Sequence, residues 1–382
     1  MWREAIRPLE RAWQRFVLET LHLGCRAALA IRPLPPVDGK PPSPRSMVVF
    51  STAGIGDTLS DTPAIRALRE SFPTCRITAV VHRRRKEVLA ENPHIDSLVL
   101  HRKGLVGFYR TLRAIRRARP DVVVVLRAND PDTWPLAYLS GALSLVGRPA
   151  NTKFGFLINR PVPVPEWDDL HGVEATLALV RELGAYTTDP RLVFRVNAGA
   201  RRRIQELLEA QGLDRASLVA MQVHTSPRLA FRDWPVESFV TVGQAILRDY
   251  PVRLVLTGGK EDRAKGAMIQ EALGVRASCV AGDLRLSETA ALLERCLALL
   301  TTDTGVMHLG FAVGVPTLAF LHPYNAHRVG PYGYGGRHRA VQLGAPARDA
   351  NGRLRSLAEL PPEVVYAAFR DFVPSPAARA VG

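Results

Sequence analysis

The turn Asp303-Thr304-Gly305 stands between an apolar run and a helical pattern, and its residue types suit an anion. Asp303 and Thr304 are typical helix N-cap residues, and Gly305 lets the backbone come close to a ligand. Free N–H groups and the helix dipole favour an anion at such a helix start. His308 lies one turn further on, at a spacing that returns it to the same end of the helix. The turn predicts a phosphate-binding site, and an ordinary capped helix without a ligand is the alternative.

Three more polar loops follow apolar runs in the same half of the chain. Hydroxyls, a guanidinium group and a helix amino end together can hold a diphosphate without metal. A carboxylate from the second loop can take ribose hydroxyls. The residues concerned are Thr225, Ser226 and Arg232 in the first loop, Glu261 and Asp262 in the second, and Asp283 with Leu284 in the third.

In the first half of the chain, one glycine-rich loop carries an acid. Gly54 and Gly56 precede Asp57 between an apolar run and a helical pattern. The loop is no dinucleotide fingerprint, because Leu59 occupies the position of the third glycine, and it lacks the G-K-[ST] of a P-loop. Asp57 is therefore predicted to lie at a ligand site, where a carboxylate can act as a general base. A simple helix cap is the alternative.

Strand-like and helix-like runs alternate twice along the chain, and they position these loops. The predicted strands are 47–51, 76–81, 97–100 and 121–126, then 218–223, 252–256, 278–280, 297–301 and 317–321. Helices are predicted near 60–71, 84–91, 106–118 and 171–183, then near 236–249, 261–273, 287–295, 305–313 and 361–373. Continuous apolar runs fit buried parallel strands. The pattern predicts an α/β protein with two Rossmann-like domains facing across a cleft, where ligands bind at the carboxyl ends of the strands.

The chain is predicted to divide at 45, 195 and 350. Residues 1–45 hold an amphipathic helix and a proline-rich linker that separates it from the core. Arg3, Arg7, Arg11 and Arg15 form an i, i+4 row beside Trp2 and other apolar residues. Such a helix suits a membrane interface, or it packs on the protein body with its arginines in solvent. Residues 46–195 and 196–350 are the two Rossmann-like domains, and 351–382 are a terminal helix and tail.

Composition narrows the class of protein. The 382 residues are 47% hydrophobic and include four widely separated cysteines, which indicate neither a disulfide framework nor a zinc site. No run is long and apolar enough to span a membrane, and the amino end does not resemble a secretory signal. The net charge of +15 is spread along the chain, whereas a nucleic-acid module more often concentrates it. Anionic small substrates or an anionic membrane surface explain its sign as well.

Four motifs resemble those of the glycosyltransferase family 9, the ADP-heptose:lipopolysaccharide heptosyltransferases and their relatives. They are the G-x-G-D-T loop with Asp57, the segment that ends in Arg232-Asp233-Trp234-Pro235, the T-G-G-x-E-D loop at 257–262, and T-D-T-G-x-M-H-L-x-x-x-x-G-V-P-T at 302–317. The resemblance covers roughly residues 47–335, and the last motif is its most specific part.

The resemblance implies the GT-B fold and an inverting, metal-independent sugar transfer with no cofactor. It implies that Asp57 is the catalytic base, with Arg232 in a catalytic role on the diphosphate. The donor, an ADP-heptose or similar nucleotide sugar, would be held by Thr225, Ser226, Asp262, Leu284, Asp303, Thr304, Gly305 and His308. Two departures stand beside this site: Arg232 replaces a frequent lysine, and His322-Pro323-Tyr324-Asn325 replaces a G-P-T-like turn.

The acceptor is expected to be an anionic, lipid-linked glycan such as a lipopolysaccharide inner core. Gly56, Arg83 and Arg84 are expected to face it, because both segments follow strands of the first domain. A basic face of Arg110, Arg113 and Arg117 fits the same acceptor, although a charge run is often a solvated surface. The expected location is cytoplasmic, with peripheral contact to the inner membrane through the amino-terminal helix. A sugar-nucleotide epimerase and a non-catalytic carbohydrate-binding protein on the same scaffold remain alternatives.

Overall fold

The computed structural model describes residues 2–36, 43–149, 153–223 and 227–373, and the side chains of these residues except 2–16 and 227–229. It forms two compact units. Unit 1 comprises residues 1–167 and 173–188, and unit 2 comprises residues 168–172 and 189–382. The main division thus falls at 188 rather than at the predicted 195.

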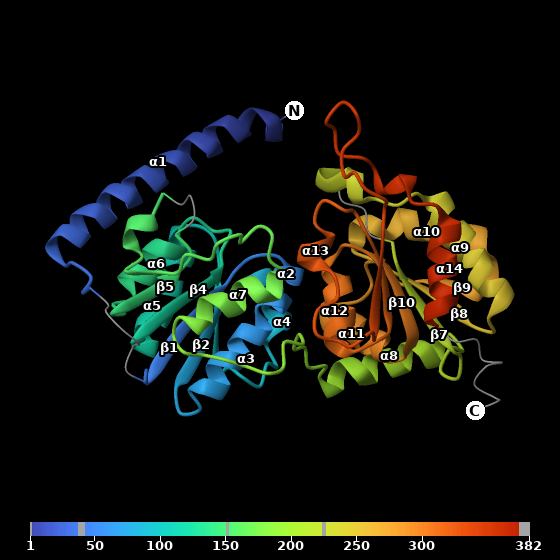
Figure 1. Ribbon diagram of the computed structural model, residues 1–382, viewed down its shortest axis with the longest axis horizontal. Helices are drawn as coiled ribbons and strands as arrows, with labels where there is room; N and C mark the ends of the chain where they lie inside the picture. The colour runs from blue at the N-terminus through green and yellow to red at the C-terminus, as the bar shows by residue number, and fades with distance from the viewer. Residues whose placement is uncertain (1, 37–42, 150–152, 224–226, 374–382) are drawn as a thin grey trace. The chain divides into compact units, whose positions relative to one another are not determined.

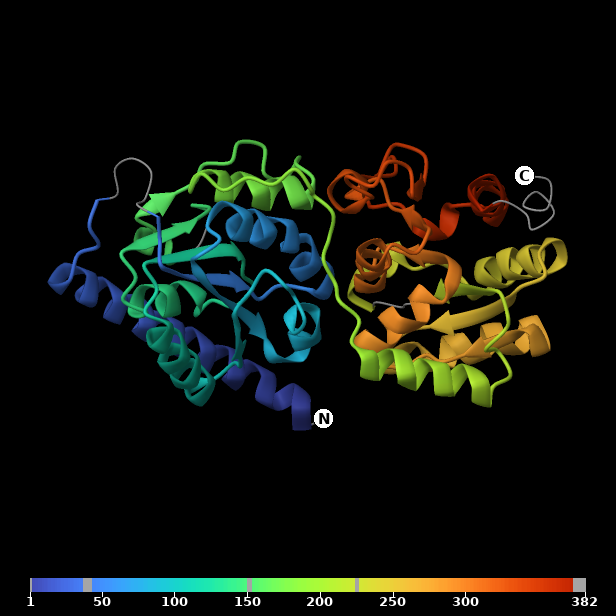
Figure 2. The same ribbon diagram turned by 90° about the horizontal axis from the view of Figure 1, so that it is seen from below.

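Unit 1 is built on a parallel sheet with the strand order β3-β2-β1-β4-β5-β6. Helices lie on both faces of this sheet (Figures 1 and 2). The strands are β1 (Ser46–Ser51), β2 (Arg76–His82), β3 (Ser97–His101), β4 (Val122–Arg127), β5 (Ser144–Gly147) and β6 (Arg160–Pro161). The helices are α1 (Trp2–Ile31), α2 (Ile55–Ser60), α3 (Thr62–Ser71), α4 (Lys86–Leu89), α5 (Leu105–Ala118), α6 (Thr133–Leu139) and α7 (Gly172–Arg181), with 3₁₀ turns η1 (Arg83–Arg85) and η2 (Gly155–Leu157).

Unit 2 repeats this architecture with the order β12-β11-β10-β7-β8-β9, so both units have the Rossmann strand order. Its strands are β7 (Leu218–Gln222), β8 (Arg253–Thr257), β9 (Ala277–Cys279), β10 (Cys296–Thr302), β11 (Thr317–Leu321) and β12 (His338–Gln342). Its helices are α8 (Ala198–Ala210), α9 (Val236–Asp249), α10 (Arg263–Leu273), α11 (Leu286–Glu294), α12 (Gly305–Val313), α13 (Ala326–Val329) and α14 (Pro362–Phe372). The 3₁₀ turns are η3 (Pro227–Arg232), η4 (Lys260–Asp262), η5 (Gly274–Arg276) and η6 (Leu357–Glu359).

The second half of α1 is part of unit 1, which corrects the prediction that a linker keeps this helix separate from the core. Cys25 is 3% exposed and belongs to the same apolar cluster as Trp134 and Phe154. Leu18, Leu21, Ala28 and Leu29 pack against that cluster. Their three- and four-residue spacing puts them on one helix face, which the body of unit 1 covers.

Helix α14 likewise belongs to a core instead of forming a separate tail. Val365 and Phe369 are fully buried in the apolar cluster of unit 2, together with Trp234 and Phe320. Helix α14 therefore completes the second Rossmann unit.

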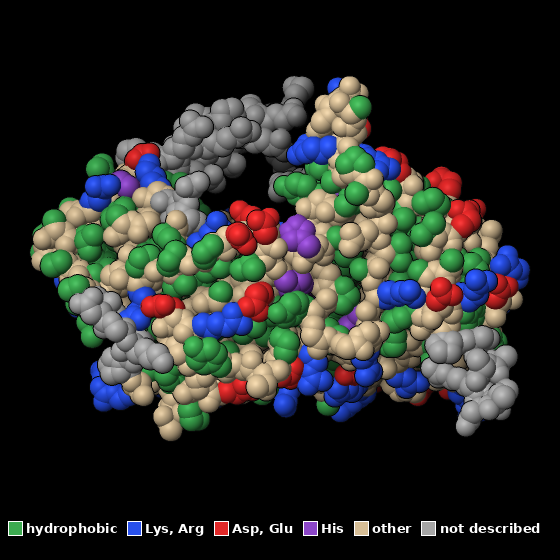
Figure 3. All heavy atoms as spheres, viewed as in Figure 1, with side chains coloured by type: hydrophobic (Ala, Val, Ile, Leu, Met, Phe, Trp, Pro, Cys, Tyr) green, Lys and Arg blue, Asp and Glu red, His purple; other side chains and the backbone are tan. Residues whose placement is uncertain are grey.

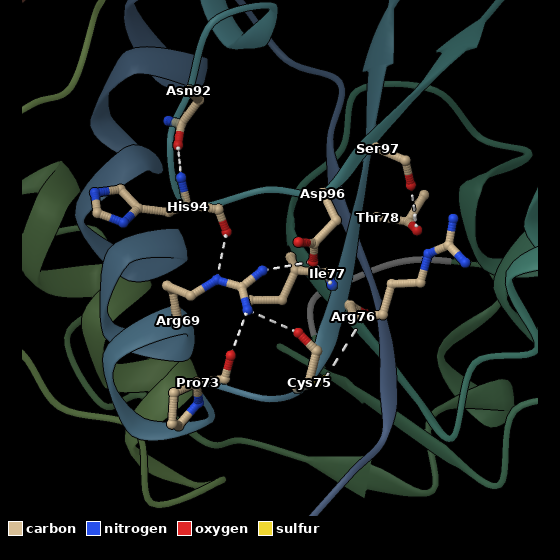
Figure 4. A network of polar contacts seen from close by, with 10 residues as sticks. All are labelled: Arg69, Pro73, Cys75, Arg76, Ile77, Thr78, Asn92, His94, Asp96 and Ser97. Carbon is tan, nitrogen blue, oxygen red and sulfur yellow. Dashed lines mark hydrogen bonds and ion pairs between the residues drawn. The ribbon is translucent and has the colours of Figure 1, made fainter.

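In unit 1, Arg69 of α3 contacts the two segments that lead into β2 and β3. Arg69 donates hydrogen bonds to the carbonyl oxygens of Pro73 and Cys75 at 3.0 and 2.8 Å, and it pairs with Asp96 at 2.5 Å (Figure 4). The Asp96 carboxylate also accepts the Ile77 N–H at 2.7 Å. This network lies at the amino ends of β2 and β3, away from the loops predicted to bind ligands.

On the face seen in Figure 3, basic and acidic side chains occur on both units. Among the described residues, no helix is both long and apolar enough to cross a membrane.

Helix α12 packs so closely on β10 and β11 that Gly310 has no room for a side chain. A Cβ there would lie 2.7 Å from Leu299 Cδ2 and 2.8 Å from Thr317 Oγ1. We expect Gly310→Ala to lower the free energy of unfolding by about 1–3 kcal/mol, because overpacking outweighs the better helix propensity of alanine. Gly24→Ala in α1 is the matched control, since nothing lies within 4 Å of its added Cβ. Urea unfolding of both variants measures the difference, and equal stabilities would contradict the packing argument.

Candidate functional site

In unit 2, the four predicted loops end neighbouring parallel strands. The order β10-β7-β8-β9 puts the loops after these strands along one edge of the sheet. Two of the loops are joined directly, because the Gly282 N–H donates to the Gly258 carbonyl at 2.9 Å. A Cβ on Gly282 would lie 2.9 Å from Lys260 Cα, so glycine is required for this approach.

The start of α12 has the form that the sequence predicted. Thr304 is the N-cap in extended conformation, and its hydroxyl accepts the Met307 N–H at 3.3 Å. Gly305 is the first helical residue, and the N–H groups of a first turn have no intrahelical partner. The backbone at Thr304 and Gly305 is thus the part suited to an anion, while the threonine hydroxyl serves the cap.

Arg232 is held beside this helix start by Asp303. Its Nη1 lies 2.6 Å from Asp303 Oδ2, and the two side chains are 20% and 10% exposed. Asn325 donates to the same carboxylate oxygen at 2.7 Å. The Phe231 ring lies under the guanidinium, 5.3 Å from its central carbon. A positive charge is therefore fixed next to the amino end of α12.

The Trp234-Pro235 part of the motif anchors the loop that carries Arg232. Trp234 is fully buried, packs edge-on against Phe239 at 4.9 Å, and donates its indole N–H to the Leu360 carbonyl at 3.1 Å. Lys265 donates to the Trp234 carbonyl and to Asp233, both at 2.6 Å. The tryptophan is a structural anchor, and it limits where Arg232 can lie.

The segment at 322–325, which departs from the family pattern, is part of this arrangement. The buried His322 faces the Arg355 carbonyl at 3.0 Å and packs edge-on against Phe231. Burial lowers the pKa of His322. The departure thus supplies Asn325 as a second partner of Asp303, a role that the sequence analysis did not assign.

Two predicted nucleotide-binding side chains are buried. Asp262 is 0% exposed, and its carboxylate accepts the Gly259 N–H at 2.7 Å. Since this acid caps η4, the exposed Glu261 is the acid at the surface of that loop, and the assignment of Asp262 to the ribose stays a prediction. His308 is 7% exposed and packs against Phe311, so its side chain does not lie on the surface. Leu284 is partly exposed, and Thr225 and Ser226 lie outside the described residues.

In unit 1, Asp57 occupies the first turn of α2 at the carboxyl end of β1. Its Oδ2 accepts the Gly54 N–H at 3.0 Å, so the acid does form the cap contact of the alternative interpretation. Its Oδ1 pairs with Arg127 at 3.2 Å, and 47% of the side chain remains exposed. The carboxylate is thus oriented from two sides and still accessible to a substrate.

Arg127 and Asp61 stand behind Asp57, and the sequence analysis missed both. Arg127 Nε lies 3.5 Å from Asp61 Oδ1, and the Ser51 hydroxyl donates to Asp61 Oδ2 at 2.6 Å. The signal for Arg127 is a cation that ends the apolar run of β4. Because β4 lies next to β1 in the sheet, that cation reaches the loop after β1.

Arg83 and Arg84 are exposed in η1, directly after β2 and at the same edge of unit 1 as Asp57. Their neighbour Arg85 donates to the Thr52 carbonyl at 2.9 Å, which ties η1 to the loop of Gly54 and Gly56. The structure thus brings the three predicted acceptor-binding residues to one edge of the sheet.

The buried Asp61 carboxyl is expected to make the stability of the protein depend on pH. It is 0% exposed, and burial raises its pKa to about 7, against the opposing charge of Arg127. The folded state therefore binds the proton of the Asp61 carboxyl more tightly than the unfolded state does. The contribution of this proton to the free energy of unfolding is complete below pH 4 and is lost as the pH rises through about 7.

We expect the free energy of unfolding of Asp61→Asn, relative to that of the parent, to be higher at pH 8 than at pH 5, by at most about 3 kcal/mol. Urea unfolding of both proteins at the two pH values measures this. A stability difference that is the same at both would show that Asp61 does not titrate in this range.

The comparisons with known proteins support the family resemblance. The family model described as "Glycosyltransferase family 9 (heptosyltransferase)" matches residues 144–354, more than half of the chain. Lipopolysaccharide heptosyltransferase 3 of Escherichia coli is 22% identical over 344 residues, covering 84% of this chain and 97% of that protein.

Two solved structures share the fold. The family 9 glycosyltransferase from Veillonella parvula DSM 2008 has a TM-score of 0.75 at 24% identity, covering 86% of this chain and 97% of that one. E. coli ADP-heptose lps heptosyltransferase II has a TM-score of 0.72 at 18% identity, covering 86% and 98%. At these identities the likeness establishes the GT-B fold alone. With the family match, it follows that the chain belongs to glycosyltransferase family 9, the heptosyltransferases, and is an enzyme of that class.

Proposed function

We propose that the chain transfers a heptose from ADP-heptose to an anionic, lipid-linked glycan of the lipopolysaccharide inner-core type. The observation that carries this proposal is the Arg232–Asp303 pair beside the amino end of α12. A fixed cation and free backbone N–H groups are what a departing diphosphate needs. The E. coli relatives named for ADP-heptose and lipopolysaccharide support the choice of donor and acceptor.

In the proposed reaction, the Asp57 carboxylate takes the proton from an acceptor hydroxyl. The oxygen then attacks the anomeric carbon from the face opposite the diphosphate, so the configuration inverts. The bond from the anomeric carbon to the diphosphate oxygen breaks, and Arg232 with the backbone at Thr304 and Gly305 stabilises the charge that develops there. This chemistry requires Asp57 of unit 1 to meet the donor held by unit 2 during the cycle. Arg127 keeps the carboxylate oriented meanwhile.

The transfer is proposed to need no metal, because the guanidinium and the helix start supply the positive charge on the leaving group. EDTA is therefore expected to leave the rate unchanged. A rate that EDTA abolishes and Mg²⁺ restores would contradict this part of the proposal.

The acceptor is proposed to lie at the carboxyl edge of unit 1, against Gly56, Arg83 and Arg84. Two exposed arginines next to the base suit carboxylated or phosphorylated sugars. The enzyme is proposed to work at the cytoplasmic face of the inner membrane, with the amino half of α1 near the lipid. Replacing Arg3, Arg7, Arg11 and Arg15 by glutamine tests that role, because weaker binding to anionic vesicles is then expected.

An epimerase would convert a nucleotide sugar with no acceptor present, and a binding protein would turn nothing over. The family assignment favours transfer over both.

The nucleotide is tested by thermal shifts with ADP, UDP, GDP and NAD side by side. A specific ligand at a hundred times its Kd stabilises a protein by about 3 kcal/mol, so ADP is expected to raise the midpoint most. A larger shift with UDP or GDP would overturn the choice of ADP-heptose.

A further inference from the structure

The first turn of α5 exposes three large apolar side chains. Leu105, Val106 and Tyr109 are 67%, 64% and 63% exposed. They lie on one face of the helix, opposite the buried Thr111 and Ile115 that face the body of unit 1. Figure 1 shows α5 in unit 1.

The local backbone fixes this exposed turn. Gly104 precedes the helix at φ +92°, a conformation that favours glycine. Gly107 lies so close to the Arg102 carbonyl that a Cβ would be 2.0 Å from its oxygen. The helix start is therefore wedged against the turn before it, which keeps Leu105 and Val106 facing outward.

Cations surround the apolar side chains. Residues 101–120 contain seven Lys and Arg and no Asp or Glu. Arg102, Lys103, Arg110 and Arg113 are exposed next to the apolar turn. Lys103 pairs with Asp130 at 3.2 Å, whereas within the described part of the chain Arg102, Arg110 and Arg113 have no ion pair. The α5 patch, meaning Leu105, Val106, Tyr109 and these four cations, is thus apolar at its centre and positive around it.

We propose that the α5 patch docks on an anionic lipid surface. Leucine and valine side chains enter the boundary between headgroups and acyl chains, tyrosine suits the headgroup level, and arginines bind lipid phosphates while their stems cover apolar surface. The charge favours this occupant over a protein partner, because the patch carries four exposed cations, three of which have no ion pair among the described residues, and such a surface matches a uniformly negative one.

The α5 patch lies near the proposed acceptor site of unit 1. Helix α5 follows the carboxyl end of β3, at the sheet edge of unit 1 that also carries Asp57 after β1 and Arg83 after β2. A membrane against α5 would bring a lipid-linked acceptor to that edge. This role of the docking rests on the proposed function, whereas the docking itself does not.

The test is sedimentation of the full-length protein with vesicles of phosphatidylcholine, with and without phosphatidylglycerol. The parent is expected to bind the anionic vesicles and to be released by salt. Leu105→Gln/Val106→Gln/Tyr109→Gln and, separately, Arg110→Gln/Arg113→Gln are expected to weaken binding about tenfold. Met268→Gln/Val275→Gln, at side chains 56% and 88% exposed in unit 2, and Arg202→Gln/Arg203→Gln on α8 are the matched controls and should bind like the parent.

The docking proposal is overturned if the parent does not bind anionic vesicles. It is also overturned if both α5 variants bind as the parent does, for example because the arginines of residues 3–15 carry all the affinity. Sugar transfer to a detergent-solubilised acceptor should be unchanged in the apolar triple variant. If the parent transfers no sugar yet vesicle binding depends on α5, the proposed function fails and the docking surface stands.

Discussion

Asp57→Asn is expected to lower the rate of sugar transfer at least a hundredfold. Asparagine keeps an oxygen that can accept the Gly54 N–H but cannot take a proton, and positioned general bases contribute about 10²–10⁴ to such rates. The measurement is the initial rate of acceptor-dependent ADP release at saturating donor.

Glu288→Gln is the matched control for this substitution. Glu288 has the same place in the first turn of α11, where its carboxylate accepts the Arg285 N–H at 2.8 Å. Both variants change a capping acid to its amide, so their effects on the free energy of unfolding should be similar. The rate of sugar transfer should fall in Asp57→Asn and not in Glu288→Gln. Asp57→Asn transfer within threefold of the parent would remove Asp57 as the base.

Arg232→Gln is expected to lower transfer about 10²–10³-fold, the usual cost of removing a preorganised donor from a developing anion. The effect should appear mainly in kcat, because Asp303 and Phe231 already hold the guanidinium before the charge develops. Arg232→Lys should retain part of the rate, since it keeps the charge and loses the forked geometry.

The control for Arg232 is Arg248→Gln. Arg248 also pairs with an acid, Asp249, at 2.7 Å, but both side chains are largely in solvent, at 68% and 38% exposure. Such a surface pair contributes little. If the two glutamine variants keep the same kcat, the Arg232 guanidinium has no part in the reaction.

The sequence predicted the fold well where periodicity was strong. Strand β11 and helix α9 have the predicted bounds, and the family and the GT-B fold are confirmed. Helices α2, α6, α8 and α13 and strands β5, β6 and β12 were not predicted. Strands β5 and β6 span four and two residues, too few to show a period, and Pro161 stands in β6, where a proline argues against a strand.

Some site residues could be predicted from the local sequence, whereas others depend on contacts between distant parts of the chain. Thr304 as the N-cap follows from its residue type at the start of a helical pattern, which can be seen in a sequence. Arg127 behind Asp57 depends on which strands are neighbours, and Asn325 depends on how the chain returns after β11. These pairings join residues 70 and 22 positions apart, so no local pattern reveals them. The roles given to the site residues stay predictions.

Burial was also beyond the sequence. Asp262 and Glu261 are adjacent acids of the same loop, and only packing decides that Asp262 turns inward to cap η4. The amino-terminal helix is a similar case, because its apolar stripe fits a membrane or a protein surface equally. For residues 18–29 that surface is the core of unit 1.

The most direct test incubates the full-length protein with ADP-heptose, with and without a lipid-linked anionic glycan, and follows ADP release and the anomeric configuration of the new linkage by NMR. The account predicts ADP release only with the acceptor, and a linkage of configuration opposite to that of the donor. Donor conversion without acceptor, or a linkage that retains the donor configuration, would contradict it.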